Sequence, residues 1–135
     1  MQVRTYIGLD VGEIRTGIAR ASSVARLAEP LKVVPTGEVV PELKKIIEDP
    51  GVEAVIVGLP RNLNGDDTAQ TAWVRQWLQN ARPLLPEIPF YWQDEALTTK
   101  IAAEQMGKNI TEVDSLAASI ILQDFLDAGE ESEEA

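Results

Sequence analysis

Short apolar runs and helical repeats of hydrophobic side chains alternate along this sequence. Residues 3–9 form an apolar, β-branched run that stops at Asp10, which predicts a buried strand that enters a turn. Apolar character resumes over residues 16–21 and again over residues 31–34. The spacing predicts three antiparallel strands, the first two joined by a hairpin connection over residues 10–15.

The middle of the chain predicts a helix, a buried strand and a loop, in that order. Helical spacing of the apolar side chains begins near Pro41 and ends at the turn formers of residues 49–51. Residues 52–57 are continuously hydrophobic, as expected of a strand that is covered on both faces. Residues 58–65 are rich in glycine, proline and asparagine, which predicts a loop.

The second half of the chain predicts three helices and one short strand. Asp67 and Gln70 fit a capping box for a helix that runs to about Asn80. A short strand over residues 90–92 precedes a short helix that a threonine caps, and Thr111 opens the last helix. Strands and helices in this order favour an α/β layered domain over a barrel or a bundle.

Length and composition predict one domain. With 135 residues the chain can bury one core but not two stable ones. The domain is expected to span residues 1–127, followed by an acidic, disordered tail at residues 128–135. The sequence has no apolar signal core and no run long enough to span a bilayer, so a soluble, cytoplasmic protein without a membrane partner is expected.

The formal net charge of −10 argues against a conventional nucleic-acid-binding protein, which normally presents a basic patch. Half of that charge is gathered at the C-terminal end, in Asp127, Glu130, Glu131, Glu133 and Glu134. The first stretch of the chain instead carries more arginine and lysine than aspartate and glutamate. A locally basic strip can therefore form on an acidic protein.

Three acids lie where predicted strands or helices meet loops. Asp10 ends the first strand, Glu95 follows the last strand, and Asp114 lies in the first turn of the last helix. Acids that converge at one edge of an α/β sheet repel one another unless a cation joins them, so they predict a metal site. The chain has no cysteine and no histidine, so the metal must take oxygen ligands, which favours Mg²⁺ or Mn²⁺.

Each of these acids also has a purely structural interpretation. Asp10 can be a turn residue ahead of Gly12, and Glu95 can be a solvated loop acid. Asp114 stands three residues after Thr111, where the helix dipole favours a capping-box partner. The spacing of the residues does not choose between these roles and a metal site.

The predicted loop over residues 58–65 offers a second kind of site. Gly58 and Gly65 allow close backbone approach, and Asn62 and Asn64 offer donors, so the loop can cradle a phosphate with its N–H groups. It is not a Walker loop, because it lacks the Gly-Lys-Ser/Thr ending. An ordinary surface loop is the alternative interpretation.

Four blocks of sequence carry a combined pattern over most of the chain. They read YIGLDVGEIRTGIA at residues 6–19, VIVGLPRNLNG at 55–65, DEALTT at 94–99 and VDSLAASIILQ at 113–123. In this order the blocks resemble the YqgF/RuvX family of nucleases. The resemblance implies an RNase H-like fold, a three-layer domain with a mixed five-stranded sheet and helices on both faces, in a bacterial cytoplasmic protein.

The resemblance also implies roles for particular residues. Asp10, Glu95 and Asp114 match the family's acidic positions, which makes them the expected catalytic acids and metal ligands. The residues expected to bind substrate are Arg15, Gly58, Pro60 and Asn62. Two departures weaken nucleic-acid binding: Ala96 stands where the family usually has arginine, and the stretch that follows it is short and lacks a basic run.

Family members are described as nucleases that mature the precursor of small-subunit ribosomal RNA and as Holliday junction resolvases. The resemblance therefore predicts metal-dependent phosphodiester hydrolysis, in RNA rather than in four-way DNA junctions. Junction cleavage is the alternative and would require a homodimer that presents two sites, whereas a monomer suffices for RNA. A catalytically silent binding domain is a third interpretation, which the net charge and Ala96 favour.

Overall fold

A computed structural model describes residues 3–96, 107, 110–128 and 134–135 of the chain. Within these residues five strands form a single sheet in the order β3-β2-β1-β4-β5. The strands are β1 (Thr5–Val11), β2 (Arg15–Ser22), β3 (Glu29–Pro35), β4 (Val52–Arg61) and β5 (Phe90–Ala96). The helices are α1 (Val39–Ile46), α2 (Ala69–Ala81) and α4 (Ile110–Asp127), with short 3-10 helices η1 (Thr36–Glu38) and η2 (Arg82–Leu84).

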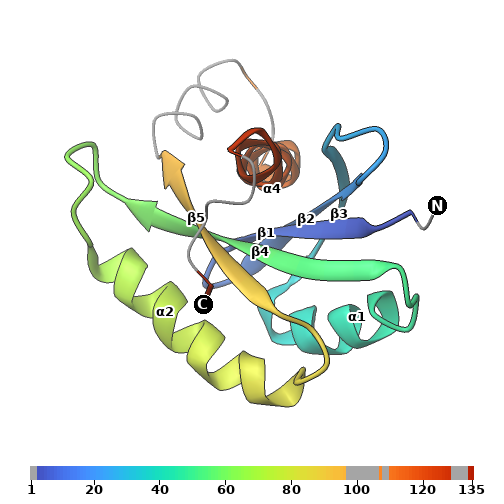
Figure 1. The fold of residues 1–135 in the computed structure, drawn as a ribbon. Helices are drawn as coiled ribbons and strands as arrows, with labels where there is room; N and C mark the ends of the chain where they lie inside the picture. Colours follow the sequence, from blue (N-terminus) through green and yellow to red (C-terminus); the bar gives the residue numbers. More distant parts are fainter. Residues whose placement is uncertain (1–2, 97–106, 108–109, 129–133) are drawn as a thin grey trace.

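The sheet is the middle of three layers (Figure 1). Helix α4 packs on one face, and α1 and α2 pack on the other. Strands β1 to β3 form an antiparallel meander, whereas β4 and β5 run parallel to β1. The prediction of an α/β domain with a mixed five-stranded sheet and helices on both faces is confirmed.

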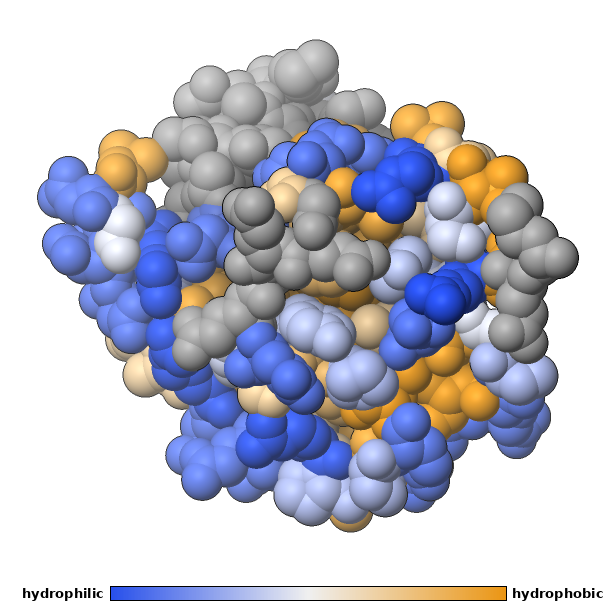
Figure 2. All heavy atoms as spheres, viewed as in Figure 1, coloured by the Kyte–Doolittle hydropathy of each residue, from blue (hydrophilic) through white to orange (hydrophobic). Residues whose placement is uncertain are grey.

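Alternation along the strands divides the apolar side chains into two cores. On β1, Ile7 and Leu9 belong to the core beneath α1 and α2, which also holds Val74 of α2. Tyr6 points the other way, into the core beneath α4, where its ring lies 6.1 Å from that of Phe125. Figure 2 shows mainly hydrophilic side chains over the outer surface of α2, as expected of a helix that buries one stripe. No helix in the described part of the chain is long and apolar enough to cross a membrane.

Strand β4 continues through Arg61, so the prediction of a loop over residues 58–65 is wrong for its first half. The end of β4 pairs with the end of β5 in a parallel ladder, and Leu59 within it is buried. Pro60 is tolerated in β4 because the strand pairs with β1 only as far as Val57, so the missing N–H of Pro60 costs no hydrogen bond to β1. Strand β5 also extends beyond the predicted residues 90–92, so Glu95 lies inside a strand and not past it.

Helix α2 begins at a threonine capping box and not at the predicted pair of Asp67 and Gln70. Thr68 Oγ1 accepts a hydrogen bond from Thr71 N at 3.3 Å, and Thr71 Oγ1 accepts one from Thr68 N at 2.9 Å. Asp67 instead forms ion pairs with two arginines. Because those arginines hold the carboxylate, it does not serve as the cap.

Helix α4 begins at Ile110, so Thr111 lies within the helix and does not open it as predicted. Asp114 lies four residues after the first residue of the helix. The short helix predicted between β5 and α4 lies outside the described residues, as does most of the predicted acidic tail. The described end of that tail lies beside β5, where Ala135 N donates to Phe90 O at 2.8 Å.

The β2–β3 loop holds the C-terminal end of α4. Arg26, whose φ of 52° lies in the left-handed region, donates from Nη2 to Leu126 O at 2.7 Å. The Gln123 side chain accepts from Ala28 N at 2.9 Å and donates to Arg26 O at 3.2 Å. A cation at the last turn also complements the helix dipole. These bonds fix the end of α4 from a loop that is distant in sequence.

Nearer its N-terminal end, α4 touches the backbone of the sheet directly. A Cβ at Gly17 of β2 would overlap the carbonyl oxygen of Asp114, and a Cβ at Gly58 of β4 would overlap the Ile121 side chain. A larger residue at either position would hold the helix away from the sheet. The two glycines therefore set how closely Asp114 approaches the strands.

Gly17→Ala is expected to destabilise the fold, because backbone atoms of Asp114 occupy the space of the new methyl group. Overpacking of this kind costs about 1–3 kcal/mol, and urea unfolding measures it. Gly37→Ala is the matched control, since a Cβ at Gly37 meets nothing within 4 Å. Equal stabilities of the two variants would contradict the close packing.

Candidate functional site

The C-terminal ends of β1, β4 and β5 lie at the same edge of the sheet, because these strands are parallel. Asp10 is the next-to-last residue of β1, and Glu95 is the next-to-last residue of β5. Tyr6 and Tyr91, each four residues before one of these acids, pack in or against the core beneath α4. Side chains an even number of positions apart on a strand share a face, so both acids face α4.

Asp114 reaches the same edge from α4. Its backbone carbonyl lies against Gly17, which pairs directly with Asp10 across the β1–β2 ladder. Asp10 is 4% exposed and Asp114 is 7% exposed, whereas Glu95 is half-buried, with Oε2 at 3.3 Å from where a Cβ of Gly58 would lie. The structure thus brings the three predicted acids to one face and one edge of the sheet.

The oxygen donors of these acids suit a hard divalent cation. Carboxylates are the ligands that Mg²⁺ and Mn²⁺ prefer, and the sequence has neither thiolate nor imidazole to offer a softer metal. Among the described residues, no group of three or more acids lies close enough together to hold a metal ion. The donor chemistry fits the predicted metal, which would have to draw the carboxylates closer together.

Arg15, the first residue of β2, holds Asp114. Its Nε donates to Asp114 Oδ2 at 3.2 Å. The Arg15 side chain is 41% exposed, whereas the Asp114 side chain is 9% exposed. The guanidinium balances a carboxylate that is nearly removed from water. Both residues border an open hollow of about 270 Å³ between the β1–β2 turn and Gln70 of α2. Arg15 can therefore meet an anion from solvent while it contacts Asp114.

Thr36 of η1 fixes the turn that carries Arg15, and the sequence pattern did not single it out. Its Oγ1 donates to Gly12 O at 2.6 Å and lies 2.9 Å from Thr16 Oγ1, while its N–H donates to Ile14 O at 2.9 Å. Both threonines are buried. A threonine just after a predicted strand looks like any turn residue, so only the fold reveals this role.

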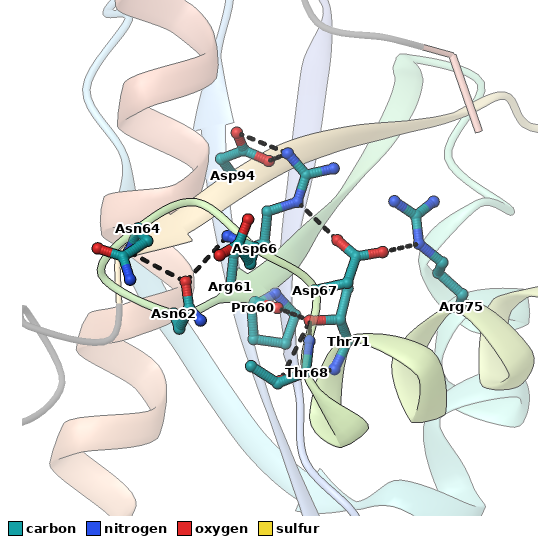
Figure 3. Close-up of polar contacts among 10 residues, drawn as sticks. All are labelled: Pro60, Arg61, Asn62, Asn64, Asp66, Asp67, Thr68, Thr71, Arg75 and Asp94. Atoms are coloured by element: carbon teal, nitrogen blue, oxygen red, sulfur yellow. Dashed lines mark hydrogen bonds and ion pairs between the residues drawn. The ribbon is translucent and has the colours of Figure 1, made fainter.

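The residues predicted as a phosphate loop are divided between a strand and a turn. Pro60 lies in β4, where it pairs in register with Glu95. Asn62 lies beyond the strand, and its Oδ1 accepts hydrogen bonds from Asn64 N at 3.0 Å and Asp66 N at 2.9 Å (Figure 3). These two backbone N–H groups are engaged within the turn, which the Asn62 side-chain oxygen organises. The role of Asn62 in substrate binding stays a prediction.

Known proteins share both the sequence and the fold. The model of the RuvX family, described as a Holliday junction resolvase, matches residues 4–128. The chain belongs to the RuvX family. RuvX relatives include a protein of Roseiflexus sp. (strain RS-1), 41% identical over 90% of this chain and 93% of its own length. Another, of Chloroflexus aggregans, is 37% identical over 95% of this chain and 96% of its own length. Both are named for a proposed nuclease activity on pre-16S rRNA, and the predicted YqgF/RuvX resemblance is confirmed.

Solved structures place this RuvX chain in a wider fold group. It is similar to T. thermophilus RuvC in complex with a Holliday junction substrate, with a TM-score of 0.60 and 16% identity over 98% of this chain and 99% of that one. A second Thermus thermophilus RuvC structure gives a TM-score of 0.55 and 14% identity over 97% and 99% of the two chains. At these identities the likeness concerns the fold, and the predicted RNase H-like architecture is confirmed.

Thr36→Val is expected to loosen the turn that carries Arg15, because it keeps the shape of the side chain and removes its hydroxyl. The loss leaves the Thr16 hydroxyl and the Gly12 carbonyl without their Thr36 partner, at a cost of about 1–3 kcal/mol. Thermal and urea unfolding measure this cost. Thr36→Ser, which keeps the hydroxyl, is the control, and an equal loss in both variants would assign the effect to packing.

Proposed function

We propose that this RuvX protein is a divalent-metal-dependent nuclease whose working acids are Asp10, Glu95 and Asp114. One observation carries the proposal: carboxylates from β1, β5 and α4 share one face and one edge of the sheet. Two of them, Asp10 and Asp114, are nearly buried, and Arg15 balances the charge of Asp114. Family membership and the RuvC-like fold support the same function.

Mg²⁺ or Mn²⁺ held by these acids would lower the pKa of a bound water and stabilise the leaving oxygen of a phosphodiester. The chain itself supplies rigid placement. Asp10 is held within a paired strand, and Asp114 within a helix that rests on Gly17. Arg15 would contact a substrate phosphate from the rim of the hollow, since its guanidinium is partly exposed.

We propose RNA as the substrate, as in maturation of precursor small-subunit ribosomal RNA in the cytoplasm. The names of the relatives support this choice. The net charge of −10 supports it too, because a four-way DNA junction is a dense polyanion that an acidic surface grips poorly. A short single strand needs only a few phosphate contacts, such as one from Arg15. A monomer is sufficient for this reaction.

Junction cleavage is the second candidate function. The description of the matching family supports it, and so does the likeness to a RuvC that holds a Holliday junction substrate. It would require a homodimer with two sites, because a junction is resolved by paired cuts. Substrate choice and oligomeric state therefore separate the two proposals.

Metal binding is expected to raise the melting temperature, because a cation relieves repulsion among carboxylates that folding brings near one another. At a metal concentration of about 100 times Kd the gain is about 2.7 kcal/mol. Thermal melts with and without Mn²⁺ measure it in the wild type, Glu95→Gln and Asp114→Asn. Glu53→Gln is the control, because Glu53 is a half-exposed acid near the start of β4, at the opposite end of the strand from the candidate site. Equal shifts in all four proteins would place the metal elsewhere.

Cleavage of single-stranded RNA is expected to exceed cleavage of intact four-way DNA junctions at equal enzyme, Mn²⁺ and salt. Matched labelled oligonucleotides resolved on denaturing gels measure both rates. Asp10→Asn should lose about 100-fold or more of the activity, as is usual for a group of this importance, and so controls for contaminating nuclease. Symmetric nicking of the junction at the higher rate, by a protein that is dimeric in solution, would favour the resolvase.

A further inference from the structure

Four charged side chains join β4, β5 and the start of α2 on the face opposite α4 (Figure 3). Arg61 lies between two carboxylates: its Nε is 3.2 Å from Asp67 Oδ1, and its Nη1 is 3.4 Å from both oxygens of Asp94. Arg75 holds Asp67 from its other side, Nε to Oδ2 at 3.6 Å. Arg75 also lies over the ring of Trp92, 5.6 Å from its centroid.

Arg61 is the best shielded member of this network. Its side chain is 30% exposed, against 55% for Asp67 and 67% for Asp94. The Nε atom is buried without a well-directed hydrogen bond, so it depends on the nearby Asp67 charge. Single exposed ion pairs contribute little, about 0–1 kcal/mol, but here one shielded guanidinium serves two carboxylates from different elements. Arg61 therefore ties the end of β5 to the start of α2.

The strand that Arg61 holds is the one that carries Glu95. Asp94 and Glu95 are consecutive on β5, so their side chains point to opposite faces of the sheet. β5 is an edge strand of the sheet. Among the described residues, its part after Trp92 pairs only with β4, for example through Glu95 and Pro60. An anchor on Asp94 thus limits how the backbone at Glu95 can move.

We propose that Arg61 is a positioning residue for Glu95, acting through Asp94 and not by contact with the substrate. The inference rests on the proposed function, since it gives Arg61 a task in the site of the three acids. A half-buried carboxylate on an edge strand reaches a metal reproducibly only if its backbone is held. Arg61 supplies that constraint from the face of the sheet opposite the one that Glu95 faces.

The strand register offers a direct way to relocate this charge. Arg61 pairs with Ala96 in the parallel ladder, and paired residues of neighbouring strands share a face. Position 96 is also two residues from Asp94 on that face. An arginine introduced by Ala96→Arg would therefore stand beside the position that Arg61→Gln empties, within reach of the same carboxylate.

The test uses the full chain as the wild type, as Arg61→Gln, and as Arg61→Gln combined with Ala96→Arg. Arg4→Gln is the matched control, because it removes an exposed ion pair with Glu53 in the other half of β4. Amide hydrogen exchange in metal-free buffer reports how firmly residues 93–96 are held. The Mn²⁺-induced shift in melting temperature reports how well Glu95 serves a metal.

In Arg61→Gln we expect exchange over residues 93–96 to rise about five-fold, with the rest of the sheet unchanged. A five-fold change corresponds to about 1 kcal/mol, the upper end of the range for an ion pair near the surface. The Mn²⁺ shift should fall in the same variant. The added Ala96→Arg should restore both measurements, and Arg4→Gln should leave both as in the wild type. This pattern would establish the positioning role.

Unchanged exchange over residues 93–96 in Arg61→Gln overturns the inference and leaves the proposed nuclease untouched. A uniform rise across the sheet also overturns it, because Arg61 would then stabilise the fold as a whole. If the wild type neither cleaves RNA or DNA nor gains stability from Mn²⁺, the proposed function fails. The exchange measurement still decides in that case whether Arg61 holds the end of β5.

Discussion

The site depends on how closely α4 rests on the sheet. Helices usually stand off a sheet by the length of their side chains, but at Gly17 the backbone of α4 replaces a side chain. That contact puts Asp114 over the β1–β2 ladder at the position where Gly17 pairs with Asp10. Gly58 allows a similar approach next to Glu95. Two missing side chains therefore bring acids from three separate elements to one edge of the sheet.

Close packing also buries two of the acids, and burying a carboxylate costs free energy. Asp10 and Asp114 are almost completely buried. A buried carboxylate needs a charged or hydrogen-bonding partner to replace the water that it has lost. Arg15 supplies one such partner to Asp114. The β1–β2 turn that presents Arg15 is in turn fixed by the buried hydroxyl of Thr36. Thr36 thus stabilises the turn next to Arg15, and Arg15 in turn binds Asp114.

Much of the architecture could be predicted from the sequence, and the errors have physical causes. Continuous hydrophobicity located β4, and alternation of apolar runs located β1 and β2, because core burial dominates those signals. Turn propensity assigns Gly58 and Pro60 to a loop because it is local, whereas the pairing of β4 with β5 that overrides it is not. For the same reason the sequence pattern puts Glu95 beyond the strand that contains it.

The candidate site was predictable only in part. Asp10, Glu95 and Asp114 were singled out by position and by family resemblance, and spacing alone could not separate them from turn and cap residues. The Thr68 and Thr71 capping box was missed because Asp67 offers an equally good cap in sequence. Thr36 and Arg61 act through partners distant in sequence, so no local pattern marks them.

The contacts of the β2–β3 loop with the C-terminal end of α4 have a consequence for the orientation of the helix. Arg26 and Gln123 fix the C-terminal end of the helix, while Gly17 fixes its depth near Asp114. The helix is thus attached to the sheet and its loops at two points that lie well apart along its axis. One point alone would leave α4 free to pivot, whereas two fix the direction of its axis, so Asp114 cannot swing sideways unless one of the contacts breaks.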